Sequence, residues 1–263
     1  MRLIESPSLV LHAFDYRETS RIVRLATRDA GIVSVIARGA RRPKSSFGPA
    51  LDLFTSGVAH LALHPTHDLH TLTGFDSTRS RPALAASLAR FTAASALSEL
   101  CMRFAKEDDS GHVYETATVL LDVLSNASNT EVPGLVLAGM WRVVAELGFA
   151  PSLAHCASCH DGLEPSAATT FHHRAGGALC DRCAAASSGG RTIPADARHL
   201  VAAWLTGSEF PLDDHDGGKS ARAHQRLLRE FLEEHVGDGR PLRAFLTWEQ
   251  LRHGTALSSI PSG

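Results

Sequence analysis

The stretch "RIVRLATRDAGIVSVIARG", residues 21–39, holds two runs of Ile, Val, Leu and Thr on either side of a glycine. Runs of this composition are typical of β-strands, and Gly31 predicts a tight hairpin between residues 21–28 and 32–39. Three more runs of the same kind occupy residues 8–14, 57–64 and 68–75. Five short strands within the first eighty residues predict a small β-barrel.

The segment after the hairpin, "GARRPKSSFGP" (39–49), is predicted to be a loop because its glycines and prolines interrupt regular structure. It is also basic, although the chain of 263 residues has a formal net charge of −2. Residues 1–50 carry 9 Lys and Arg against 4 Asp and Glu, or +5, whereas residues 91–263 carry 14 against 21, or −7. Since binding responds to the local field, this loop is a candidate for holding a polyanion.

A phosphate backbone is the polyanion that this pattern favours. Guanidinium groups bind phosphate oxygens through a planar fork, and a cationic strand pair beside a cationic loop would form a groove on a small barrel. Nothing in the sequence resembles a base-reading helix, so the predicted binding is independent of base sequence and sensitive to salt. A solvated turn without a ligand is the alternative. The basic residues are Arg17, Arg21, Arg24 and Arg28 before the loop, and Arg38, Arg41, Arg42 and Lys44 around it.

Four aromatic residues lie close to these basic residues in the sequence, namely Phe14, Tyr16, Phe47 and Phe54. Their rings could stack on bases. In a small barrel, however, aromatic side chains more often fill the core, and core packing is the interpretation that we favour for each.

The pattern becomes helical after about residue 81, where apolar residues recur at three- and four-residue spacing through alanine-rich sequence. Pro133 and Gly148 mark the beginning and the end of one of these helices. The predicted helical segments are residues 84–104, 113–124, 133–148, 195–206 and 219–236.

Four of the five cysteines have the spacing C-x2-C-x20-C-x2-C: Cys156, Cys159, Cys180 and Cys183. Two CxxC turns direct their thiolates to one point and complete a tetrahedron around a zinc ion. Four thiolates leave no open position for water or substrate, so the predicted site holds one structural ion. A histidine could replace one cysteine, but we prefer four sulfur ligands because both CxxC units are intact. The nearby histidines are His155, His160, His172 and His173.

Catalytic chemistry is weakly indicated. The histidines of "HLALHPTHDLH" (60–70) would suit a metal-dependent hydrolase, but Pro65 turns the chain between them and Asp68 is the only carboxylate within this stretch. Exposed polar residues on a hairpin are the interpretation that we favour for His60, His64, His67 and His70. Cys101 lies on an apolar helical face and is predicted to be buried. The sequence contains no nucleophile-elbow, phosphate-loop, dinucleotide-binding or HExxH motif, so we do not expect an enzyme.

The sequence also indicates a compartment. No apolar run approaches the roughly 20 residues needed to span a bilayer. Residues 1–14 lack the long apolar stretch and cleavage site of a secretory signal. We therefore expect a cytoplasmic protein with no membrane partner, and a reducing compartment favours metal binding over disulfides for the paired cysteines.

Three segments together resemble a known family. "LVLHAFDYRETSRIVRLATRDAGIVSVIARGARRPKSSFGPALDLF" (9–54) is similar to the amino-terminal segment of the bacterial recombination mediators of the RecO family. "ELGFAPSLAHCASC" (146–159) and "RAGGALCDRC" (174–183) look like the same family's helix-to-zinc junction and second cysteine knuckle. The resemblance spans most of residues 1–250 and is specific at the loop and the knuckles.

The resemblance implies a multidomain α+β fold with an N-terminal OB-fold β-barrel, followed by an all-helical domain with an embedded four-cysteine zinc module. In this arrangement the OB-fold, DNA-binding domain is residues 1–80, and the zinc module is residues 151–190. The helical domain is residues 81–150 together with residues 191–250, and residues 251–263 form a flexible tail. Some family members lack the cysteines, so zinc would be a scaffold element.

The resemblance also implies a function in DNA repair through the RecF pathway of recombination. The family binds single- and double-stranded DNA and anneals complementary strands. With RecR it helps to load RecA onto DNA covered by single-strand-binding protein, so the protein would be associated with the nucleoid. The DNA-binding residues carried over are Arg38, Arg41, Arg42 and Lys44 of the loop, with Arg17 and Arg21 as flanking positions. The alternative is a zinc-ribbon adaptor that binds protein without direct DNA contact.

Overall fold

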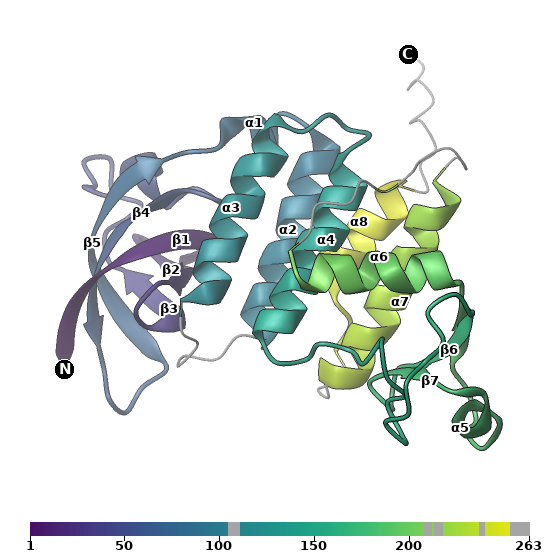
Figure 1. Ribbon diagram of the computed structural model, residues 1–263. Coiled ribbons are helices and arrows are strands. Elements are labelled where there is room, and N and C mark those ends of the chain that lie inside the picture. The colour runs from purple at the N-terminus through teal and green to yellow at the C-terminus, as the bar shows by residue number, and fades with distance from the viewer. Residues whose placement is uncertain (105–110, 208–211, 213–217, 237–239, 253–263) are drawn as a thin grey trace, which may run out of the picture. The chain divides into compact units, whose positions relative to one another are not determined.

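The computed structural model describes residues 1–104, 111–207, 212, 218–236 and 240–252. The chain divides into two compact units, Met1–Ala127 and Ser128–Gly263. The first unit contains a β-barrel and three helices, and the second contains the cysteine module and the remaining helices (Figure 1). Of the predicted tail, residues 253–263 lie outside the described residues.

Five strands form a closed barrel in the order β1-β2-β3-β5-β4, and β4 closes it by pairing with β1. All neighbouring strands are antiparallel except β3 and β5, which are parallel. This five-stranded barrel confirms the predicted OB-fold. The strands are β1 (Arg2–Tyr16), β2 (Ser20–Thr27), β3 (Gly31–Ala37), β4 (Ser56–Leu63) and β5 (Leu69–Arg79).

Alternating side chains explain why these segments form a barrel. Val23 and Leu25 of β2 point inward with Val33 and Val35 of β3, and all four are almost fully buried. The predicted hairpin between these strands is confirmed, since Gly31 has the positive φ of 60° that its turn requires.

Strand β1 begins six residues earlier than the sequence pattern predicts. Its first part pairs with β4, and its second part pairs with β2 after an irregularity between Val10 and His12. Ser6 and Ser8 are polar yet fully buried, and Ser8 Oγ donates a hydrogen bond to the carbonyl of Ser6. Polar residues of this kind hide the beginning of the strand from a hydrophobicity pattern.

Helices α1 (Pro82–Ala85), α2 (Leu88–Phe104) and α3 (His112–Asn126) complete the first unit. The predicted helix over 84–104 is interrupted at Ser87, whose hydroxyl accepts a hydrogen bond from the backbone N–H of Arg90 at the start of α2. Arg81 joins these helices to the barrel: its buried guanidinium donates to Asp122 of α3 and to the carbonyl of Phe54. Cys101 is fully buried, as predicted.

In the second unit, helix α7 (Lys219–Val236) begins and ends at the predicted residues. Helix α8 (Arg243–Arg252) was not predicted, because its apolar positions are few, although Phe245 and Trp248 bury their rings against each other. Helices α4 (Val132–Glu146) and α6 (Ala195–Leu205) agree closely with the prediction. None of the described helices is long and apolar enough to cross a membrane.

The cysteine module contains a small sheet with the strand order β7-β6-β8 and one short helix, none of which the sequence predicted. Gly177 of β7 has a positive φ of 154°, and an added Cβ would lie 2.2 Å from the carbonyl oxygen of Ser152. Only glycine therefore allows the two segments to approach each other here. The elements are β6 (Thr169–His172), β7 (Gly177–Leu179), α5 (Asp181–Ala185) and β8 (Arg191–Ile193).

Candidate nucleic-acid interface and metal centre

The structure brings the basic loop against the turn that joins β1 to β2. The backbone N–H of Arg41 donates a hydrogen bond of 3.0 Å to the carbonyl of Thr19. Its guanidinium Nη1 donates to the carbonyls of Arg17 at 3.3 Å and Glu18 at 3.2 Å. The two segments that the sequence singled out separately therefore lie side by side in the first unit.

A carboxylate connects the same two segments. Asp15 Oδ1 accepts from Nε of Arg21 at 3.2 Å, and Asp15 Oδ2 lies 3.2 Å from Nε of Arg41. Sequence reasoning did not select Asp15, since its only signal was an acid beside several basic residues. The carboxylate is half-exposed, so its contacts lie at the surface of the barrel.

Four of the other predicted basic residues lack such an ion pair. Within the part of the chain that the structure describes, no ion pair is formed by Arg17, Arg38, Arg42 or Lys44, and all four are exposed. The guanidinium of Arg17 lies over the ring of Tyr16, 5.2 Å from its centroid. These exposed cations and the paired Arg21 and Arg41 come from the β1–β2 turn, the beginning of β2 and the loop after β3.

Two other arginines of β2 and its following turn are occupied elsewhere. Arg24 Nη2 lies 3.5 Å from the carbonyl of Met102 in α2. Arg28 forms an exposed ion pair with Glu115 of α3, and its guanidinium lies over the ring of Tyr114. These side chains contact the helices of the first unit instead of extending the cationic surface.

The aromatic residues near the loop divide into two groups. Phe47 and Phe54 are buried, 6% and 2% exposed, in agreement with core packing. Phe14 is 45% exposed on β1 and lies near the ring of His12. The expectation of core packing is therefore wrong for Phe14, whereas Tyr16 is partly buried and has the guanidinium of Arg17 over its ring.

The histidine tract does not gather into a metal site. The two ring nitrogens of His60 face different carboxylates: Nε2 lies 2.8 Å from Asp76 and Nδ1 lies 3.2 Å from Glu5. The hydrogen bond to Asp76 raises the pKa of His60. Among the described residues, the cysteines are the only cluster that could hold a metal ion, so the hydrolase alternative has no structural support.

The four cysteine sulfur atoms lie within 4.8 Å of one another, at Cys156, Cys159, Cys180 and Cys183. Cys159 Sγ and Cys180 Sγ are 3.7 Å apart. A tetrahedron with Zn–S bonds of about 2.3 Å has sulfur atoms about 3.8 Å apart, so the four side chains fit a tetrahedral ion. The cluster contains no histidine, and His172 is engaged by the carbonyl of Ser188.

Two turns present these thiols. In the first, the backbone N–H of Cys156 donates to the carbonyl of Asp161, and the N–H of His160 donates back to the carbonyl of Cys156. In the second, Cys180 precedes α5 and its carbonyl accepts from the N–H of Ala184. Arg182 then joins the two turns, since its Nη2 lies 3.0 Å from Asp161 Oδ2.

The electrostatics of the cluster favour one thiolate and disfavour a second. Burial opposes ionisation of Cys156, but backbone hydrogen bonds at Cys159, Cys180 and Ser158 outweigh it and lower the pKa of Cys156 to about 6. At Cys159 a backbone hydrogen bond from Asp161 favours the thiolate. Burial and the side chains of Cys156 and Asp161 oppose it, and the pKa rises to about 12. A divalent cation would favour the ionised form of every ligand.

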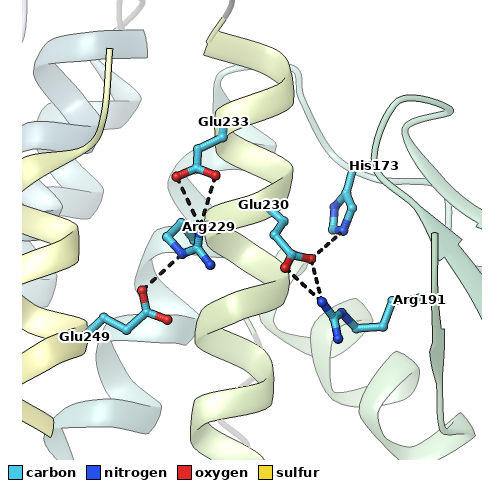
Figure 2. Close-up of polar contacts among 6 residues, drawn as sticks. All are labelled: His173, Arg191, Arg229, Glu230, Glu233 and Glu249. Atoms are coloured by element: carbon cyan, nitrogen blue, oxygen red, sulfur yellow. Dashed lines mark hydrogen bonds and ion pairs between the residues drawn. The ribbon is translucent and has the colours of Figure 1, made fainter. Parts of the chain in front are cut away.

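Helix α7 anchors the module through Glu230 (Figure 2). Its carboxylate accepts from Nη2 of Arg191 at 2.8 Å and lies 3.1 Å from Nε2 of His173. Burial lowers the pKa of His173 despite the opposing effect of Glu230, so the neutral ring forms a hydrogen bond and Arg191 supplies the charge. The ring of Phe171 packs against that of Phe231 beside this cluster.

The fold and site define a class of protein in which an OB-fold barrel with a cationic loop precedes helices that carry a closed four-cysteine centre. Residues 1–81 match the family described as Recombination protein O N terminal, and residues 85–244 match Recombination protein O C terminal. The chain belongs to the Recombination protein O family.

Curated relatives are similar over most of their length. A protein named DNA repair protein RecO from Anaeromyxobacter sp. (strain Fw109-5) is 33% identical over 90% of this chain and 93% of its own. Proteins of the same name from Nocardioides sp. (strain ATCC BAA-499 / JS614) and Cupriavidus pinatubonensis are 27% and 31% identical. These alignments cover 93% and 92% of this chain and 99% and 77% of the relatives.

Proposed function

We propose that this protein acts in DNA repair and recombination as a non-enzymatic mediator that binds single- and double-stranded DNA without sequence specificity. The observation that carries the proposal is the junction of the β1–β2 turn with the basic loop, which gathers six cations on one unit. Guanidinium and ammonium groups in this arrangement suit phosphate oxygens, and the exposed ring of Phe14 suits an unpaired base. The DNA-binding residues are Arg17, Arg21, Arg38, Arg41, Arg42 and Lys44.

The mechanism that follows is strand annealing on a neutralising surface. The cationic turn and loop offset the charge of the phosphates, so two complementary strands can approach each other closely enough to pair. The free energy of annealing comes from the duplex that forms. No nucleotide hydrolysis is therefore required, in keeping with a sequence that contains no phosphate-binding loop motif.

Membership of the Recombination protein O family supports the partners that we propose. Together with RecR, the protein would help to load RecA onto DNA coated by single-strand-binding protein. We propose that it acts in the cytoplasm, at the nucleoid. The names of the curated relatives, all DNA repair protein RecO, are consistent with this assignment.

We propose that the four cysteines hold one zinc ion. Zinc suits four thiolates in a tetrahedron, and such a site supplies structural stability with no open position for a reactant. The ligands are Cys156, Cys159, Cys180 and Cys183. Arg182 and Asp161 would hold the two turns together around the ion.

The proposed DNA site is tested by comparing two arginines of the same barrel. Arg42 is exposed in the basic loop, whereas Arg2 begins β1 at the opposite end of that strand from the turn. Replacing Arg42 by Ala should weaken binding of single- and double-stranded oligonucleotides by about three- to fivefold and reduce the slope of log K against log salt by about 0.7 to 0.9. Arg2→Ala removes the same charge and should change neither quantity appreciably.

Fluorescence anisotropy at several salt concentrations measures both quantities. Equal effects of the two substitutions would show that only net charge matters. Absence of oligonucleotide binding by the intact protein would instead favour a protein-binding adaptor.

A further inference from the structure

We infer that Asp15 is a positioning residue for the contact with DNA, an inference that rests on the proposed function. Its carboxylate holds Arg21 of β2 and Arg41 of the basic loop at the same time, one on each oxygen. The β1–β2 turn and the loop thereby become one surface of fixed shape.

Strand pairing places this carboxylate at the rim of the barrel. Asp15 is the cross-strand partner of Arg21, and Arg21 in turn pairs with Ala37, the last residue of β3 and a member of the barrel core. Side chains of cross-strand partners lie on the same face of a sheet. Asp15 and Arg21 therefore lie on the inward-facing side of their strands, at the end of the barrel core. The loop after β3 begins at the same end.

The contacts of Arg41 extend the effect of Asp15 to the turn. The same guanidinium that lies against Asp15 donates to the carbonyls of Arg17 and Glu18, which lie within that turn. Arg17 has a positive φ of 53°, unusual for a residue other than glycine. Fixing Arg41 thus fixes the backbone that carries the exposed side chain of Arg17.

An acid in a cationic site has two opposite consequences. As a charge, it repels phosphates and weakens binding. As a ligand of two arginines, it relieves the repulsion between them and lowers the entropy lost when they meet a phosphate. When the charge of Asp15 is removed, the first effect predicts a higher affinity for DNA and the second predicts a lower affinity.

Glu18 supplies a matched control. It is an exposed acid of the same turn, and within the described part of the chain its carboxylate forms no ion pair. Glu18→Gln and Asp15→Asn each remove one negative charge from this surface. Only the second substitution removes the link between Arg21 and Arg41.

The experiment measures oligonucleotide affinity and its salt dependence for the full-length protein and both variants. Asp15→Asn should bind about two- to fivefold more weakly, the range expected from loss of an exposed ion-pair network. Its salt slope should fall by about 0.7 to 1.8 as one or two guanidinium groups cease to meet phosphates. Glu18→Gln should bind more tightly, by up to about twofold, with no loss of slope.

A second pair of substitutions keeps the net charge constant. Arg41→Lys retains the cation but loses the guanidinium that reaches Asp15 and the turn carbonyls together, so binding should weaken as in Asp15→Asn. Arg2→Lys, at the opposite end of β1 from the turn, should leave the affinity nearly unchanged. Circular dichroism and thermal unfolding establish that all four variants are folded.

The outcomes separate this inference from the proposed function. Tighter binding by both Asp15→Asn and Glu18→Gln, together with equal behaviour of the two lysine variants, would overturn the positioning role and leave the DNA site in place. If the intact protein binds no oligonucleotide, the proposed function itself fails. Weaker binding by Asp15→Asn and Arg41→Lys alone supports the inference.

Discussion

His224 of α7 is buried in the second unit, and its ring packs edge-on against that of Trp204 at 5.0 Å between centroids. Burial lowers the pKa of His224 to about 4, although Asp196 opposes the shift. The unfolded chain, with a pKa near 6.5, takes up the proton first as the pH falls. The stability associated with this neutral ring is therefore present above pH 6.5 and is lost as the pH falls toward 4.

We predict that the free energy of unfolding decreases by about 2 kcal/mol between pH 7.5 and pH 5 through His224 alone. Urea unfolding of His224→Leu should show a pH dependence smaller by that amount. His199→Leu replaces an exposed histidine of α6 and should retain the pH dependence of the unaltered protein. If both variants keep the same dependence, the buried ring is not the group that titrates.

Residues also show where sequence reasoning reaches its limit. The loop cations could be selected from composition, because charge is a property of the sequence itself. Asp15 could not be selected in this way, because its role depends on a tertiary contact. Arg21 and Arg41 come from different segments and meet at its carboxylate. Glu230 was missed for the same reason, as its partners His173 and Arg191 lie some forty to sixty residues away in the chain.

At the level of elements, long periodic segments were predictable and short ones were not. The amphipathic helix α7 and the central strands of the barrel can be predicted because many of their apolar residues recur at regular spacing. Strands β6, β7 and β8 have only three or four residues each and are held by the packing of Phe171 and by the approach of Gly177 to Ser152. Tertiary contacts, rather than local propensity, determine such strands.

Helix α7 connects two parts of the second unit, because adjacent residues of this helix contact different elements (Figure 2). Glu230 contacts β8 and the residue after β6, while Arg229 contacts Glu249 of α8 at 3.1 Å. Glu230→Gln should lower the free energy of unfolding by about 1 kcal/mol and speed amide hydrogen exchange in residues 169–193.

Glu234→Gln is the control for this prediction. It removes an exposed pair with Arg174, whose side chain is 82% exposed, and should have almost no effect. Exchange measured by mass spectrometry locates the change. Equal exchange in the two variants would show that Glu230 does not anchor the module.

At the level of the whole molecule, the four-cysteine cluster and the cationic surface belong to different units. The division into domains made from the sequence, with helices shared between residues 81–150 and 191–250, stays a prediction. Because the four clustered cysteines lie wholly in the second unit, we predict that loss of a bound metal ion lowers thermal stability while DNA affinity changes less than twofold.

Metal analysis of the full-length protein tests this. We expect one zinc ion per chain, lost in Cys156→Ser and in Cys183→Ser. Cys101→Ala changes a buried cysteine of the first unit and should keep the ion. An ion that survives both ligand substitutions, or a loss of DNA binding on chelation, would contradict the prediction.

Strand β1 pairs with β2 on one side and with β4 on the other. Only its first residues pair with residues 58–63 of β4 along that edge. A chain shortened to begin at Ser8 would therefore leave the backbone of residues 58–63 without a neighbour on that side. An open edge of this kind is a template on which a strand from another molecule can add. The first seven residues thus cover a strand edge that would otherwise be open to self-association.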